Sequence, residues 1–431
     1  MFDAGLIARF VVSAAILVAL ARLAGWLAER VRQPRVIGEA CAGLLVGPAV
    51  LGSVAPAVRQ GVLPPAVTPL IEIAASLGLA VYLVSVGMTA VRRGAGGDAA
   101  GAPHALALVS LLNFAVPFLA GVAVAVPIRG AVGVTAPGPA FELVLGVAFA
   151  TSAVPVLARI LDERPAYRDL GRLALAATAT ADIVAWAVLG MATALGRGTG
   201  PGLVLWPLAL AGTGTTALLA GFAGRGPSRS SGAPHAGPGN ERSRLDRRLS
   251  SIVFAVVGVV VLIGEPSGGS GIGIVFGSLL LGMAAASFLS AAGEWARLLR
   301  IVSAPLLSLY FVETGARADI RLLSNPDLVG LAVVVVVVSV ATKVGAGVLG
   351  SRLSGMGTGD GLALGFMLNT RGLTELVVLN VGLTSGILSV DMFTVFVVMA
   401  LVTTAMTGPA LDLLASRAAS RSFDRRAGRR L

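Results

Sequence analysis

The chain has 431 residues, of which 56% are hydrophobic and 13% charged, with a mean hydropathy of +0.88 and a formal net charge of +11. A soluble domain of this length does not need so much apolar surface, so the composition predicts an all-α polytopic membrane protein. The basic residues fall in short loops and in the tail, where membrane orientation explains them, and we expect no nucleic-acid partner. One cysteine and two histidines exclude an internal disulfide and a His/Cys metal site, so no bound metal is predicted.

Apolar segments recur along the whole chain, and each can cross a hydrocarbon layer of about 30 Å. We count thirteen of them. The predicted spans are 6–27, 36–55, 67–90, 104–126, 141–161, 172–196, 203–223, 249–264, 270–291, 300–316, 327–350, 358–383 and 391–414. The first runs at full length without a small-residue cleavage site, so we expect no removable signal peptide.

The arginines predict how the chain is oriented. If the N-terminus lies outside, 23 of the 32 arginines fall in inner loops or the tail and only five in outer loops. Cytoplasmic loops carry the excess of basic residues, so the N-terminus is predicted outside and the C-terminus in the cytoplasm. The excess of alanine, glycine and arginine over a single lysine suggests a GC-rich bacterial genome, and hence a bacterial cell membrane.

The longest loop divides the chain. Residues 224–248 are rich in Gly, Ser, Pro and Arg and predict a flexible basic cytoplasmic linker. We expect a first repeat plus a linker helix over 1–223, a second, inverted repeat over 249–416, and a basic cytoplasmic tail over 417–431.

Two pairs of segments support the repeat. The stretch YLVSVGMTAVRR (82–93) ends the third segment, and YFVETGARADIR (310–321) ends the tenth. The fifth and twelfth segments both carry polar residues and helix breakers at mid-depth. The members of each pair are seven segments apart in chain order, so they run in opposite directions, as in inverted-topology repeats. Chance similarity between apolar helices is the alternative.

The fifth segment is predicted to be interrupted near Pro155, in FATSAVPVLARIL (149–161). Proline has no backbone N–H, so the carbonyl of Thr151 loses its helical partner. The hydroxyls of Thr151 and Ser152 can join that carbonyl in lining a polar cavity. Irregular backbone at this depth is tolerated only where protein or water covers it.

The twelfth segment is predicted to be interrupted in the same way. Asn369, Thr370, Arg371 and Gly372 fall half-way along it, in NTRGLTELVVLN (369–380). Two discontinuous helices that cross from opposite sides bring four half-helix ends together, and the partial charges of those ends need partners.

Asp182 is the eleventh residue of the sixth segment, one turn after Thr178. A lone acid near mid-membrane costs several kcal/mol unless a function keeps it there, so Asp182 and Thr178 are predicted to bind a proton or a cation. The alternative is that the acid only neutralises helix ends. Lys343, about seven residues from the inner end of its segment, either compensates charge in the core or snorkels to the interface.

Three further charged residues have two interpretations each. Arg371 and Glu375 lie one turn apart, so they either compensate charge in the core or simply pair with each other. Glu313, at the outer end of the tenth segment, either joins Asn369 and Thr370 in the polar lining of the broken helices or is an interfacial acid. Glu39 and Glu72 were assigned no role.

These residues carry a resemblance to a known family. FATSAVPVLARIL, GRLALAATATADIVAW (171–186) and NTRGLTELVVLN, together with RQPRVIGEACAGLLVGP (32–48) and LVTTAMTGP (401–409), resemble the monovalent cation:proton antiporter-2 family, which includes Kef-type and plant CHX-type exchangers. The resemblance implies the sodium/proton antiporter fold and a homodimer whose core moves against a dimerisation domain. It implies that Asp182 is the obligatory carboxylate, that Thr151 and Ser152 form the unwound segment, and that Lys343 is the core lysine of electrogenic members.

Two features depart from the family pattern. The family usually has Asp, Asn or Gln immediately before the obligatory acid, whereas this chain has Ala181, which leaves stoichiometry and electrogenicity open. The chain also ends shortly after the last span, so we expect no nucleotide-binding regulatory domain.

The sequence therefore predicts a secondary active antiporter that exchanges Na⁺ or K⁺ for protons, for example in pH homeostasis. It predicts neither an enzyme nor a bound cofactor beyond the transported ions. One alternative is a proton-driven exporter of an organic or ionophore-bound cation on the same fold, for which Ala181 and Ala153 would leave a wider, apolar cavity. A further alternative is a non-transporting membrane sensor or subunit, whose mid-membrane polar residues would be dispensable.

Overall fold

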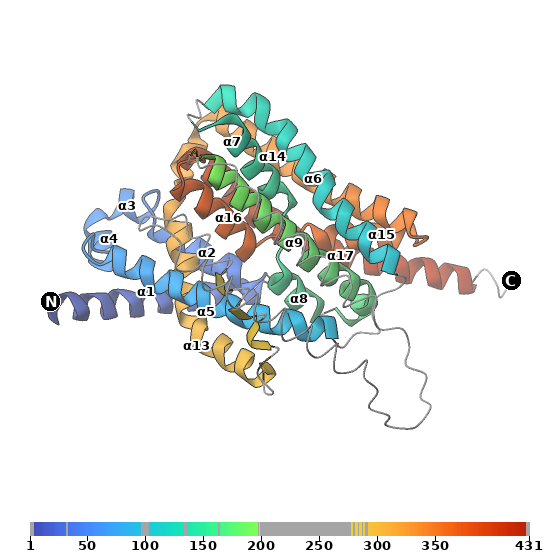
Figure 1. Ribbon diagram of the computed structural model, residues 1–431, viewed down its shortest axis with the longest axis horizontal. Helices are drawn as coiled ribbons and strands as arrows, with labels where there is room; N and C mark the ends of the chain where they lie inside the picture. Colours follow the sequence, from blue (N-terminus) through green and yellow to red (C-terminus); the bar gives the residue numbers. More distant parts are fainter. Residues whose placement is uncertain are drawn as a thin grey trace, which may run out of the picture.

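The structure is a computed structural model that describes residues 4–31, 33–95, 103–132, 136–162, 164–196 and 292–427, with residue 198 and a few residues between 277 and 288. All regular elements in these ranges are helices (Figure 1). They are α1 (Ala4–Arg30), α2 (Arg35–Val46), α3 (Leu51–Val54), α4 (Pro56–Val62), α5 (Thr68–Ala95), α6 (Pro103–Val132), α7 (Gly138–Ala150), α8 (Val154–Asp162), η1 (Pro165–Tyr167), α9 (Arg168–Gly196), α13 (Ala292–Arg317), η2 (Ile320–Ser324), α14 (Pro326–Leu353), α15 (Thr358–Leu368), α16 (Leu373–Thr384) and α17 (Val390–Ala427).

These helices match the spans predicted for the same residues. Eight stretches of the described chain are long and apolar enough to cross a membrane, and they include all or most of α1, α2, α5, α6, α9, α13, α14 and α17. The fifth and twelfth predicted spans each consist of two short helices, α7 with α8 and α15 with α16. The predicted spans 203–223 and 249–264, and nearly all of 270–291, lie outside the described residues, as does the linker 224–248. α17 continues into the segment predicted as the tail.

The helices form two groups (Figure 1). In the first helix group, α13 packs against α5, α2 and α1. In the second helix group, α6 packs against α7, α9 and α14, and α7 packs against α9, with α8 and α15–α17 alongside. The expected repeat partners α5 and α13 are therefore direct neighbours.

Close backbone contact joins α2 to α13. A Cβ added to Gly43 would lie 2.2 Å from the carbonyl oxygen of Val312, and one added to Gly315 would lie 2.2 Å from that of Ala40. Any side chain at either position would push the helices apart, so glycine is needed on both sides of the contact. The backbones of α2 and α13 are thus in direct contact at the centre of the first helix group.

Both predicted interruptions are present. α7 ends at Ala150, and residues 151–153 are non-helical before α8 begins at Val154. Pro155 is the second residue of α8, where its missing N–H removes no hydrogen bond of the helix. The second interruption separates Leu368, the last residue of α15, from α16. The fifth and twelfth predicted spans are therefore both interrupted at the depth where the sequence places polar residues.

Candidate functional site

The two interruptions lie against each other and are joined by hydrogen bonds. The backbone N–H of Ala153 donates to the carbonyl of Thr370 (2.8 Å), and the Ser152 hydroxyl donates to the carbonyl of Leu368 (2.6 Å). The Thr374 hydroxyl donates back to the carbonyl of Ser152 (2.9 Å). Backbone groups that the interruptions release from their helices are thus satisfied by the other interruption.

Gly372 allows this close approach. A Cβ at this position would lie 2.8 Å from Cγ2 of Val156 and 3.0 Å from Cβ of Ala153, and a valine side chain has little freedom to move away. We expect Gly372→Ala to separate the interruptions, with a loss of about 1–3 kcal/mol in stability. Thermal unfolding in detergent measures this.

The matched control for this prediction is Gly330→Ala in α14, where an added Cβ meets no atom within 4 Å. It should leave stability unchanged or slightly raised, because alanine favours helix over glycine. The double variant Val156→Ala with Gly372→Ala should recover part of the loss. Equal stability of the two glycine variants would contradict the steric explanation.

Two buried cations cap the C-terminal end of α7. The last carbonyls of a helix have no partner within it and carry the negative end of the helix dipole. Lys343 donates to the carbonyl of Ala150, and Arg371 donates to the carbonyls of Ala148 and Phe149. These side chains come from α14 and from the second interruption, so two elements converge on the end of α7.

Lys343 is fully buried and does not snorkel to the interface. Besides Ala150, its ammonium donates to the side-chain oxygen of Asn113 (2.9 Å), to the Asn113 carbonyl (3.2 Å) and to the Ser152 hydroxyl (2.9 Å). Asn113 was missed by the sequence reasoning, although an asparagine inside the apolar span 104–126 was a signal that could have identified it. In the described part of the chain, no hydrogen bond joins Lys343 to Asp182.

Arg371 and Glu375 form an ion pair and do more than pair with each other. Both side chains are fully buried, with 3.4 Å between Nη1 of Arg371 and Oε2 of Glu375. The guanidinium also donates to the Ser339 hydroxyl (2.7 Å). The backbone of Arg371 is held on both sides by the Thr404 hydroxyl, which accepts from its N–H and donates to its carbonyl.

Asp182 lies on α9 beside the first interruption. It is half-buried, and its carboxyl lies near the backbone N–H of Ser152. Lys343 is close enough to act on it electrostatically. Its oxygen Oδ1 is buried and has no hydrogen-bond partner in the described chain. The carboxyl thus lies at the meeting point of the interruptions, and its oxygen Oδ1 is available to bind a proton or a cation.

Other predicted residues are also buried with unused polar atoms. The Thr178 hydroxyl and both polar side-chain atoms of Asn369 have no partner among the described residues. The Thr151 hydroxyl reaches only the carbonyl of Ala148, at 3.4 Å, and that of Thr370 reaches Thr407 at 3.5 Å. Polar groups left unpaired away from water are costly and call for an explanation. Carboxylate, hydroxyl and amide oxygens are ligands suited to a hard cation or to water.

Glu313 belongs to a different cluster. It pairs with Arg317 on the next turn of α13. Arg317 also donates to Glu72 of α5 (3.2 Å) and to the side chain of Asn380 of α16 (3.0 Å). The guanidinium of Arg317 therefore bridges the first helix group to the second.

Comparison with known proteins identifies relatives of the whole chain. The family model described as "Sodium/hydrogen exchanger, transmembrane" matches residues 16–417. Cation/H(+) antiporter 17 of Arabidopsis thaliana is 32% identical over 91% of this chain and 47% of that protein. Na(+)/H(+) antiporter NhaS4 of Synechocystis is 29% identical over 91% of this chain and 94% of that protein. K(+)/H(+) antiporter 1 of Saccharomyces cerevisiae is 26% identical over 89% of this chain and 44% of that protein.

A solved structure has the same fold. The sodium proton antiporter MjNhaP1 from Methanocaldococcus jannaschii superposes with a TM-score of 0.60 at 15% identity, over 95% of this chain and 99% of the other. This likeness confirms the predicted fold. The chain spans about half the length of the plant and yeast relatives that it matches.

Proposed function

Because this chain belongs to the transmembrane sodium/hydrogen exchanger family, we propose that it exchanges a monovalent cation, Na⁺ or K⁺, for protons across a cell membrane. The names of the relatives support this, since they are cation, sodium or potassium antiporters. The observation that carries the proposal is the buried, unpartnered oxygen of Asp182 beside the meeting point of the two interruptions.

In this mechanism Asp182 is the site that proton and cation share. A protonated Asp182 is neutral, and so is a carboxylate with a monovalent cation bound, whereas the empty carboxylate is charged and costly to move through an apolar gate. Proton and cation therefore exclude each other, and each crossing of the barrier carries one or the other. The hydroxyls of Thr151, Ser152 and Thr178 and the amide of Asn369 supply additional ligands.

Alternating access then requires the second helix group to move against the first. We place the first group at the interface of a homodimer, with the N-terminus outside and the C-terminus in the cytoplasm. The hydrogen bond from Arg317 to Asn380 crosses between the groups and has to break during such a movement. Lys343 and Arg371 stay with α7, because both cap its end.

Purified protein in liposomes tests the function. With an imposed pH gradient and a pH-sensitive dye inside, addition of Na⁺ or K⁺ should drive proton movement in wild-type liposomes and not in empty ones. Organic cations added in the same assay distinguish an exporter of larger cargo. No flux with any cation would favour a non-transporting membrane subunit.

A further inference from the structure

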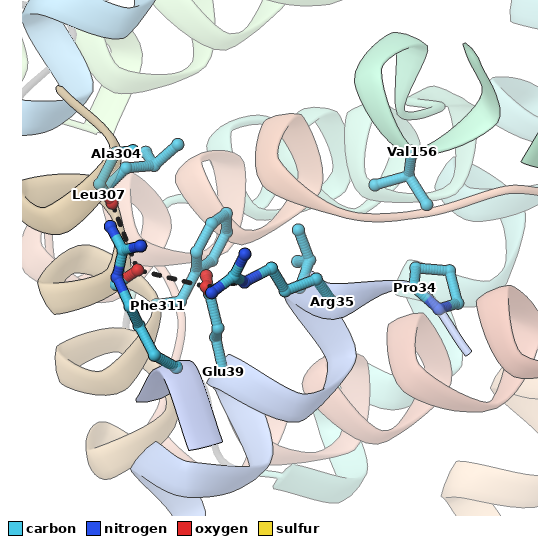
Figure 2. A pocket seen from close by; sticks show the side chains of 10 residues that line it. Pro34, Arg35, Glu39, Val156, Ala304, Leu307 and Phe311 are labelled. Carbon is cyan, nitrogen blue, oxygen red and sulfur yellow. Dashed lines mark hydrogen bonds and ion pairs between the residues drawn. The ribbon is translucent and has the colours of Figure 1, made fainter. Parts of the chain in front are cut away.

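A pocket of about 240 Å³ lies between the two helix groups (Figure 2). Helices α1, α2 and α13 line one side, and Val156 of α8 lies opposite Arg35 and Glu39. Val156 is also the residue that Gly372 packs against at the interruptions. Val156 therefore borders both the pocket and the second interruption.

Among the described residues, Glu39 is the one acid that lines this pocket, and two arginines line it as well. Oε1 of Glu39 accepts from Nε of Arg35 (3.2 Å) and from the hydroxyl of Ser308 (3.1 Å). Arg22 of α1 acts on it electrostatically. The Glu39 side chain is 7% exposed and that of Arg35 35%, so the acid is fixed between α2 and α13 while the guanidinium borders the pocket.

These contacts determine the charge that a cation meets. Arg22, Arg35 and Glu39 together have a formal charge of one positive unit, whereas the arginines alone would have two. Repulsion from a second unit charge is stronger in a pocket with protein walls than in bulk water. Glu39 also holds the guanidinium of Arg35 at the wall of the pocket formed by α2.

We propose that Glu39 is a positioning residue for cation entry, because it docks and neutralises Arg35 and so lets cations cross the pocket toward the interruptions. The proposal rests on the proposed exchange function and adds to it the access route from this side of the molecule. Glu39 touches neither Asp182 nor the interruptions in the described residues.

Transport kinetics give the first test. Glu39→Gln should raise the KM for the cation roughly fivefold from the pocket side, the effect of one unit charge over about 10 Å at an effective dielectric of about 35. The maximal rate and the KM from the opposite side should stay the same. Arg35→Gln together with Glu39→Gln should restore the KM, and Glu39→Asp should stay close to wild type. An unchanged KM in Glu39→Gln, or no restoration in the double variant, would overturn the proposal.

Thiol labelling gives a second test that needs no transport. Cys41 is the only cysteine, so Cys41→Ser provides a background in which Ala304→Cys places one thiol on the pocket wall. In this background, a cationic methanethiosulfonate reagent should label the introduced thiol fastest when Arg35→Gln is added, because the pocket then loses one positive charge. It should label the thiol slowest when Glu39→Gln is added, because the pocket then loses its negative charge. The background itself and the protein with both substitutions should react at an intermediate rate. The two extremes should differ from the intermediate rate by roughly fivefold each.

A neutral methanethiosulfonate reagent is the control, and it should label the four proteins at similar rates. Equal rates with the cationic reagent would overturn the inference, even if the protein transports. Wild-type liposomes without any cation-driven proton flux would instead reject the proposed function, while the labelling order would still show whether Glu39 sets the charge of the pocket. If the Glu39→Gln protein cannot be produced in folded form, the labelling rate with Arg35→Gln is compared with that of the background alone. Equal rates in that comparison would overturn the inference.

Discussion

Replacing Asp182 with asparagine should abolish cation-driven proton movement in liposomes. The amide has nearly the shape of the carboxyl but neither takes up a proton nor carries the charge that holds a cation. Losing one charge-assisted interaction of about 3 kcal/mol already weakens cation binding about 100-fold, and coupling is lost in addition. The fold should remain, because Oδ1 of Asp182 makes no hydrogen bond within the described chain.

The matched control is Asp360→Asn, which makes the same chemical change at an exposed position in the first turn of α15. It should transport at the wild-type rate. Thermal stability of Asp182→Asn should equal or exceed that of the wild type, which separates loss of function from loss of fold. Undiminished proton movement in a folded Asp182→Asn protein would reject the shared-site mechanism and the role we propose for this residue.

Replacing Arg371 with methionine should destabilise the protein strongly. The substitution removes the donors to the carbonyls of Ala148 and Phe149 and leaves Glu375 without its counter-ion. Removing one member of a buried ion pair typically costs about 3–5 kcal/mol, because the other charge stays buried and uncompensated. We expect a sharply reduced yield of folded protein and a lower unfolding temperature, measured by size-exclusion chromatography after heating.

A second variant identifies the cause of that loss. Combining Arg371→Met with Glu375→Gln removes the uncompensated charge, so the double variant should be more stable than Arg371→Met by about 0.5–3 kcal/mol. Arg352→Met, at an exposed position near the end of α14, should change stability by no more than about 0.5 kcal/mol. If Arg371→Met unfolded at the wild-type temperature, capping of α7 by this side chain would be unimportant.

The sequence predicted the fold class and the family, and it placed the spans of the described chain and the two interruptions close to where the structure has them. Long apolar runs are visible in one dimension because the bilayer imposes a minimum length on every span. The interruptions were found because polar residues, proline and glycine at mid-depth cannot continue an ordinary membrane helix. Thr151 and Asn369 lie where that reasoning put them, as the first residues after the ends of α7 and α15.

Contacts between distant residues could not be predicted in the same way. Lys343 was equally compatible with snorkelling, and only the packing of α14 against α6 and α7 places its ammonium on Asn113 and Ala150. Glu313 was grouped with the interruptions, whereas the structure pairs it with Arg317. Glu39 was given no role, because the sequence near it does not reveal that residues of α1, α8 and α13 form a pocket around it.

Composition, span length and the spacing of polar residues are local properties, and they determined by themselves that this chain is a polytopic membrane protein with two interrupted spans and an acid in its sixth span. The exchanger fold was implied by the resemblance of those motifs to a known family. Which polar atom satisfies which helix end depends on the packing of residues that lie more than two hundred positions apart in the chain, and only the tertiary structure decided it. Buried polar groups are costly when unpaired, and the fold pairs several of those around the interruptions through Lys343, Arg371 and Ser152. In the part of the chain that the structure describes, Thr178, Asn369 and Asp182 keep buried polar atoms without a partner. The oxygen of Asp182 that the fold leaves unpaired is therefore the place where we expect the transported ion to bind.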